Sequence, residues 1–230
     1  MVKAPARSPT RTQASATNTK KTVKGKKKAS RLADARARMY YDLIFEASEA
    51  VFGRKGYEGA TMQEIADEAG VSLKTLYATY ESKQNLYAQI RRERVGAFVA
   101  AMREAIESVD DPHDQIRALV ETYPAFLLER EDWLRIHLRT RTAWAMRPAD
   151  EEVAISWQES RDDFTRVLSE GMARGVFYEG DPEEMSVVIQ TVMQIHMARA
   201  VERGEQDPRA LADAMMVHVD RLLCPPHQRK

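Results

Sequence analysis

The side chains best suited to binding chemistry lie in one short stretch of the chain, between Thr61 and Lys83. A lysine ammonium such as that of Lys74 can donate to O6 and N7 of guanine, and a methyl group such as that of Ala78 can touch the methyl of thymine. Hydroxyl and further ammonium groups can donate to phosphate oxygens, which positions a protein on a duplex without reading its sequence. This chemistry suits double-stranded DNA if the chain presents these groups on one surface.

Capping motifs predict that this stretch forms short helices. Thr61 and Glu64 stand three residues apart and can satisfy each other's backbone N–H groups, which is a capping box at a helix start. Gly70 follows where that helix needs a left-handed residue to end. Ser72 then caps a second helix, and Ser82 caps a third.

The spacing of three residues predicts how the first two of these helices cross. Ala66 is small where the two backbones approach, Gly70 tolerates a positive φ four positions later, and Leu76 can lock the second helix inward. A small residue, a glycine and an apolar residue at these separations are typical of a helix-turn-helix. The alternative is a plain helical hairpin inside a core.

Helical periodicity separates the two faces of the second helix. Leu73, Leu76 and Tyr80 share one face at roughly 100° per residue and are predicted to be buried. Lys74 and Ala78 lie opposite, on the face that can enter a major groove, and the flanking polar groups are better placed for phosphates. The candidate DNA-binding residues are Thr61, Ser72, Lys74, Thr75, Tyr77, Ala78 and Lys83.

The rest of the chain is also predicted to be helical, because its apolar residues recur at helical and not at alternating spacing. A first helix is predicted from about Asp34 to Phe52. Three Asp-Pro pairs, at 111–112, 181–182 and 207–208, suit helix starts with an Asp cap and Pro in the first turn. The sequence therefore predicts an all-α protein of about nine helices.

The formal net charge of zero conceals an uneven distribution. Residues 1–31 hold ten of the 35 basic residues and no acidic residue, so the remainder carries ten more acidic than basic groups. A cationic tail on an acidic body indicates a separate polyanionic partner for the tail. The other interpretation is a disordered tail that only increases solubility.

The sequence contains no motif that supports a metalloprotein, an enzyme or a membrane protein. The five histidines are scattered without a pair at i, i+4, and Cys224 is the single cysteine, so we expect no metal site and no disulfide. No phosphate-binding loop or nucleophile elbow is present, so we expect neither a cofactor nor an enzyme. The chain also lacks an apolar run long enough for a membrane span and a secretory h-region, which predicts a cytoplasmic protein.

Residues 93–224 are expected to form a larger helical body. A helix predicted from about Asp132 to Met146 carries two tryptophans, a histidine and a threonine at steps of four, three and four. Such a stripe could line a pocket for a small apolar or aromatic effector, although aromatic residues at helical spacing are more often core. The candidate effector-binding residues are Trp133, His137, Thr140 and Trp144.

The apolar surfaces of the last two predicted helices indicate that they contact a second copy of the chain. Residues 185–200 are apolar almost all round, and the final helix carries Leu211, Met215, Val219 and Leu222 on one face. A helix of this kind is buried on all sides, so its outer face in a two-layer bundle needs a partner. We expect a homodimer.

The run from Tyr57 to Leu86 resembles the DNA-binding domain of the TetR family of bacterial regulators, and the resemblance covers about residues 36–92. The matching elements are Gly56-Tyr57, Thr61, Ile65-Ala66, Ala69-Gly70-Val71-Ser72, Thr75-Leu76-Tyr77, Ser82-Lys83 and Leu86. The sequence departs from the family at Thr79, where His is usual, and at Tyr80, where Phe is usual. Tyr80 can still fill the core, whereas Thr79 lacks the imidazole that the family places near phosphate.

The resemblance implies an N-terminal three-helix helix-turn-helix domain on a larger helical domain that binds an effector and dimerises. It implies a transcriptional regulator, in most members a repressor that the effector releases from a palindromic operator. The alternative is a DNA-binding structural or protein-interaction factor of the same fold without a small ligand. The expected divisions are a disordered basic tail (1–33), the helix-turn-helix domain (34–92), the effector-binding and dimerisation domain (93–224) and a C-terminal tail (225–230).

Overall fold

The chain forms two compact units, Met1–Leu43 and Ile44–Lys230, in a computed structural model. The structure describes Met1 and residues 15–139 and 151–224, and for 15–30, 32–33, 151–157 and 159–160 it describes only the backbone. The predicted C-terminal tail at 225–230 lies outside these residues, as do Thr140 and Trp144.

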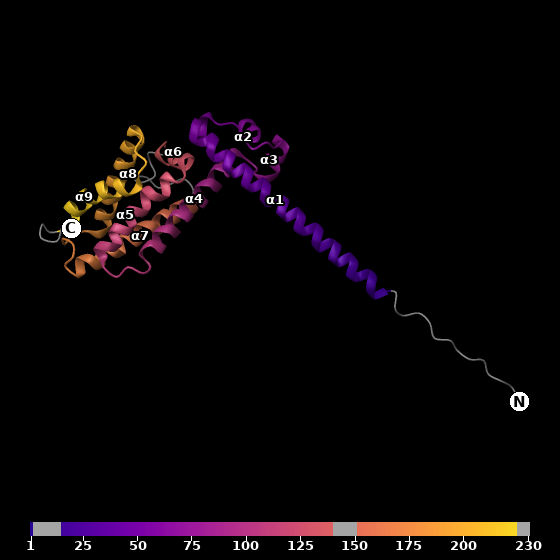
Figure 1. Ribbon diagram of the computed structural model, residues 1–230, viewed down its shortest axis with the longest axis horizontal. Helices are drawn as coiled ribbons and strands as arrows, with labels where there is room; N and C mark the ends of the chain where they lie inside the picture. The colour runs from indigo at the N-terminus through magenta and orange to yellow at the C-terminus, as the bar shows by residue number, and fades with distance from the viewer. Residues whose placement is uncertain (2–14, 140–150, 225–230) are drawn as a thin grey trace. The chain divides into compact units, whose positions relative to one another are not determined.

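The described residues contain nine α-helices and no strand, which confirms the predicted all-α class (Figure 1). The helices are α1 (Ser15–Gly59), α2 (Met62–Glu68), α3 (Leu73–Thr79), α4 (Lys83–Ile106), α5 (Pro112–Leu128), α6 (Glu131–Arg139), α7 (Glu151–Ala173), α8 (Pro182–Arg203) and α9 (Pro208–Leu223). None of the described helices combines the length and the apolar character that crossing a membrane requires.

The first helix begins much earlier than the predicted start at Asp34. Helix α1 starts at Ser15, so the expectation of a disordered tail is wrong for residues 15–33, while residues 2–14 lie outside the described part. That expectation rested on the lack of large apolar residues in this segment. Alanine and lysine, which are frequent there, have good helix propensity, and a segment that extends an existing helix needs no nucleus of its own.

Helix starts follow the capping rules. The Asp111 carboxylate accepts from the backbone N–H of His113 at 3.0 Å and from that of Asp114 at 3.2 Å, immediately before Pro112. Asp181 and Asp207 cap α8 and α9 in the same way, again with Pro in the first turn. All three predicted Asp-Pro starts are therefore confirmed.

The larger helical body is organised around α5. This helix packs against α4, α7 and α9, while α8 packs between α7 and α9. Fully buried apolar side chains from several helices meet in this core. They include Ile116, Leu119, Val167, Ile189, Met215 and Val219.

Two helical glycines provide a matched test of this packing. A Cβ built on Gly171 in α7 would lie 2.1 Å from the ring of Phe177, which is only 3% exposed. The same atom on Gly96 in α4 would meet nothing within 4 Å. We expect Gly171→Ala to lower the free energy of unfolding by about 1–3 kcal/mol through overpacking.

Gly96→Ala is the control. It should leave stability unchanged or raise it by up to about 1 kcal/mol, because alanine is the better helix former. Urea unfolding of the full chain measures both variants. Equal stability of the two alanine variants would show that Phe177 does not fill the space beside Gly171.

Candidate nucleic-acid interface

Helix α2 is fixed at its start by the predicted capping box. The Thr61 hydroxyl oxygen accepts from the backbone N–H of Glu64 at 3.2 Å, and the Glu64 carboxylate accepts from the backbone N–H of Thr61 at 3.1 Å. Lys55 also donates to Glu64, and its hydrogen bond is the main reason why the pKa of this carboxyl lies below its usual range. Thr61 is exposed but its hydroxyl already serves α2.

The turn after α2 needs the glycine that the sequence places there. Gly70 has φ = +65°, in the left-handed region, and its N–H donates to the Asp67 carbonyl at 3.2 Å. The Val71 N–H donates to the Ala66 carbonyl at 3.0 Å, which completes a Schellman ending. The chain therefore reverses within a few residues, as the helix-turn-helix spacing predicts.

Helix α3 presents two different faces. Leu76 is fully buried and Tyr80, the residue that ends the helix, is 4% exposed, whereas Leu73 is half-buried. Lys74 and Ala78 are exposed on the outer side, as predicted. The short helix is thus anchored through one face, and its other face is available to a partner.

The remaining predicted contacts of α3 lie on or beside this exposed face. Tyr77 is 49% exposed, so its ring and hydroxyl are accessible to a partner. Ser72 caps α3, because its hydroxyl oxygen accepts from the backbone N–H of Thr75 at 3.1 Å. The hydroxyls of Ser72 and Thr75 also share a hydrogen bond of 2.8 Å, so both are oriented by the protein itself.

Lys83, which is predicted to contact phosphate, also makes hydrogen bonds inside the protein. Its ammonium donates to the backbone carbonyls of Tyr57 at 2.9 Å and Ala60 at 3.0 Å, and it lies 4.5 Å from the centre of the Tyr57 ring. Two of its three N–H groups are therefore used to hold the segment that leads from α1 into α2. The sequence could not show this, since the carbonyls lie 26 and 23 positions away.

Ion pairs fix the helices around this interface. Arg54, near the end of α1, donates to the carboxylate of Glu68 at the end of α2, with its closer nitrogen at 2.8 Å. Arg94 of α4 holds Glu49 of α1 through two hydrogen bonds of 2.6 and 2.5 Å, and the Glu49 side chain is only 9% exposed. The hydrogen bond to Glu49 is the main cause of the raised pKa of Arg94. Sequence analysis identified neither pair.

The described half of the candidate effector stripe is buried. Trp133 and His137 of α6 are 4% and 3% exposed, and their ring centres lie 6.0 Å apart. His137 Nε2 lies 3.2 Å from the Tyr123 hydroxyl, and burial, aided by Arg91, lowers the pKa of His137 to about 4. The imidazole is therefore neutral near pH 7 and has the Tyr123 hydroxyl as a polar neighbour. Helix α6 begins one residue before its predicted start and is described as far as Arg139.

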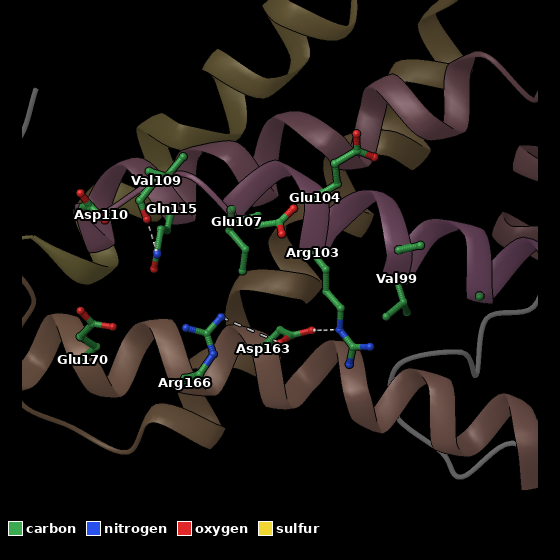
Figure 2. A pocket seen from close by; sticks show the side chains of 13 residues that line it. Val99, Arg103, Glu104, Glu107, Val109, Asp110, Gln115, Asp163, Arg166 and Glu170 are labelled. Atoms are coloured by element: carbon green, nitrogen blue, oxygen red, sulfur yellow. Dashed lines mark hydrogen bonds and ion pairs between the residues drawn. The ribbon is translucent and has the colours of Figure 1, made fainter.

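A separate open groove lies between α4 and α7 (Figure 2). Its volume is about 960 Å³, and neither Trp133 nor His137 lines it. Asp163 of α7 accepts from Arg103 of α4 at 2.8 Å across the groove, and Arg166 stands on the other side of the same carboxylate at 4.0 Å. This lining is mostly charged, so the groove is a poor match for an apolar effector.

Comparisons with known proteins show that the N-terminal region is similar to the DNA-binding region of bacterial transcriptional regulators. Residues 44–90 match a family model described as bacterial regulatory proteins of the tetR family. The chain is 40% identical over 85 residues to the HTH-type transcriptional activator FasR of Mycolicibacterium smegmatis, which covers 37% of this chain and 38% of FasR. The chain thus spans about two fifths of the length of that relative.

Solved structures extend the likeness to the helical body. The ketosteroid transcriptional regulator KstR2 of Mycobacterium tuberculosis superposes with a TM-score of 0.69 at 18% identity, covering 79% of this chain and 93% of KstR2. The transcriptional regulator FadR of Bacillus subtilis, solved with stearoyl-CoA, gives a TM-score of 0.68 at 18% identity, covering 78% and 97%. At this identity the structures show a shared fold.

Proposed function

We propose that the chain, whose residues 44–90 match the TetR family model, is a transcriptional repressor released from a palindromic operator by a small-molecule effector. The observation that carries this proposal is the geometry of α2 and α3. A capped helix, a left-handed glycine turn and a second helix anchored by Leu76 leave Lys74 and Ala78 exposed together. This is the arrangement with which a helix-turn-helix enters a major groove.

The proposed roles divide the exposed groups between bases and phosphates. Lys74 donates to guanine and Ala78 touches a thymine methyl. Tyr77 and Thr75 flank these two residues and contact phosphates, together with Thr61 and Ser72. The Thr61 oxygen accepts from Glu64, so its O–H can donate to phosphate, and the hydrogen bond between Ser72 and Thr75 leaves one of their two O–H groups to donate. Lys83 has one N–H left for a phosphate while the other two hold backbone carbonyls.

Footprinting on DNA recovered from binding selections tests the proposal. A twofold-symmetric dimer protects two half-sites one helical turn or a multiple of it apart, and the half-sites form a near-palindrome. A single half-site without symmetry, or the absence of any preferred sequence, would overturn the proposed operator recognition.

We propose that the homodimer forms through α8 and α9. The outer sides of these two helices expose apolar residues that a monomer leaves in water, and Ile195 is 55% exposed. Exposed apolar surface of this kind is typical of interaction sites when it forms a large patch. The residues concerned are Val187, Val188, Ile195, Val201, Val217 and Leu222.

A double substitution tests this surface. Ile195→Glu with Val217→Glu places two charges where the partner must pack, so we expect a monomer at micromolar concentration by analytical ultracentrifugation. Tyr178→Glu is the matched control, since Tyr178 is an exposed apolar residue in the loop between α7 and α8, and it should remain dimeric. A wild-type protein that sediments as a monomer contradicts the proposal.

We propose a small apolar or aromatic effector for the helical body, with Trp133, His137, Thr140 and Trp144 as its candidate contacts. In support, Trp133 and His137 lie together in an apolar interior with the Tyr123 hydroxyl as a polar partner. The fold is shared with FadR, which was solved with stearoyl-CoA. Sites for apolar ligands combine aromatic walls with a few polar groups in this manner.

A test for an effector distinguishes the proposed repressor from the alternative, a DNA-binding structural factor that has no small ligand. An effector should quench tryptophan fluorescence and release DNA, and Trp144→Ala should lose the response while it keeps its affinity for DNA. If fatty acyl, steroid and aromatic compounds all leave fluorescence and DNA binding unchanged, the factor without a ligand is favoured.

A further inference from the structure

Three side chains of metal-binding type meet between the first turn of α5 and the end of α9. They are His113, Asp220 and Cys224, with exposed fractions of 4%, 6% and 1%. One ligand atom from each lies within 4.8 Å of the other two. His113 precedes Asp220 by 107 positions, so only the packing of α5 against α9 brings the three together.

The donor set has a definite chemical preference. An imidazole nitrogen, a carboxylate oxygen and a thiolate sulfur together suit a borderline divalent ion such as Zn²⁺, with bonds of about 2.0–2.3 Å. Ligand atoms around a tetrahedral ion of that kind stand roughly 3.3–3.6 Å apart. The separations in the cluster therefore need adjustments of about an ångström. Asp220 and Cys224 lie in the last turn and at the C-cap of α9, where helices fray and can adjust.

The orientation of the His113 ring fits a metal on Nε2. That nitrogen lies 2.9 Å from Asp220 Oδ1. The other nitrogen, Nδ1, is buried without a hydrogen-bond partner among the described residues, and the Asp114 carboxylate lies 3.7 Å from it. A histidine that binds a metal through one nitrogen generally donates the other N–H to a carboxylate. With an ion on Nε2, the Nδ1 N–H would face Asp114.

We propose that His113, Asp220 and Cys224 form a binding site for a divalent transition-metal ion of the Zn²⁺ class, with water as the further ligand. On binding, the Cys224 thiol releases its proton to solvent and the sulfur binds as a thiolate. The ion fastens the end of α9 to the start of α5. The competing interpretation is a His113–Asp220 hydrogen bond beside a cysteine that serves only packing.

Cobalt titration of the chelator-treated full chain tests the site. Co²⁺ occupies zinc sites, and a thiolate ligand gives it a near-ultraviolet charge-transfer band. Because Cys224 is the only cysteine in the chain, that band reports this residue alone. We expect a band that saturates at one Co²⁺ per chain and disappears when Zn²⁺ is added.

Two variants that keep the packing test the other ligands. Asp220→Asn retains an acceptor for His113 and removes the charge, and His113→Asn retains a polar group at the helix start. Each should weaken Co²⁺ binding at least about tenfold. Cys224→Ser should abolish the band, and far-ultraviolet circular dichroism checks that each variant remains helical.

The matched control removes a histidine pair elsewhere. His196 and His218, on α8 and α9, have ring centres 5.1 Å apart and are the obvious competing place for a metal. His196→Asn with His218→Asn should bind Co²⁺ with the band unchanged. The proposal is overturned if the wild-type chain shows no band, if the band survives undiminished in Asp220→Asn and His113→Asn, or if the control variant alone loses metal binding.

Discussion

Replacing Arg94 with Met should lower the free energy of unfolding by about 3 kcal/mol. This is the lower end of the range expected when one partner of a buried ion pair is removed. The Glu49 side chain is 9% exposed, and both of its carboxylate oxygens accept from the Arg94 guanidinium. Removing Arg94 leaves that carboxylate enclosed without its two donors. The guanidinium also lies 5.1 Å from the centre of the Phe45 ring, so its loss costs packing as well.

A second variant shows whether the unpaired Glu49 carboxylate causes the loss of stability. Glu49→Gln combined with Arg94→Met removes both charges and keeps two side chains of similar size. We expect the double variant to recover much of the lost stability in urea unfolding, because no uncompensated carboxylate remains. If the double variant loses as much as Arg94→Met alone, packing and not charge explains the effect.

Leu76→Ala should destabilise the helix-turn-helix by about 2–5 kcal/mol, because Leu76 is fully buried and its truncation leaves a cavity. Helix α3 has seven residues and cannot persist without this anchor. We therefore expect the apparent affinity for DNA to fall at least about tenfold, in proportion to the remaining folded fraction. Circular dichroism should show that the helices of the body remain.

Leu43→Ala provides the matched comparison for Leu76→Ala. The Leu43 side chain is 41% exposed, so the same truncation removes little buried area and should cost less than about 1 kcal/mol. A comparable loss of DNA affinity in the two variants would contradict the role of Leu76 as the anchor of α3.

Local rules made the start and end of most helices predictable. The capping box at Thr61, the serine caps at Ser72 and Ser82 and the left-handed Gly70 each depend on residues within a few positions, and the structure confirms all of them. The start of α1 was missed for the opposite reason. The segment before Asp34 has few apolar residues, but continuity with the following helix is sufficient to extend α1 to Ser15.

Interactions between distant residues were not predictable from one sequence. The carbonyls held by Lys83, the Arg94–Glu49 pair and the cluster at His113 each join residues more than 20 positions apart. Their formation depends on how whole helices pack, and no periodicity in the sequence encodes that packing. The same limit applies to the charged groove between α4 and α7.

Base reading by α3 through Lys74 is tested most directly by measuring affinities for an operator and its single-base variants. Lys74→Ala should lose about 1–3 kcal/mol of discrimination at one position of each half-site and keep the preferences elsewhere. Arg166→Ala, which removes an exposed cation of α7, should match the wild type at every position. If Lys74→Ala instead weakens every sequence by the same factor, Lys74 contacts phosphate and α3 does not read bases as proposed.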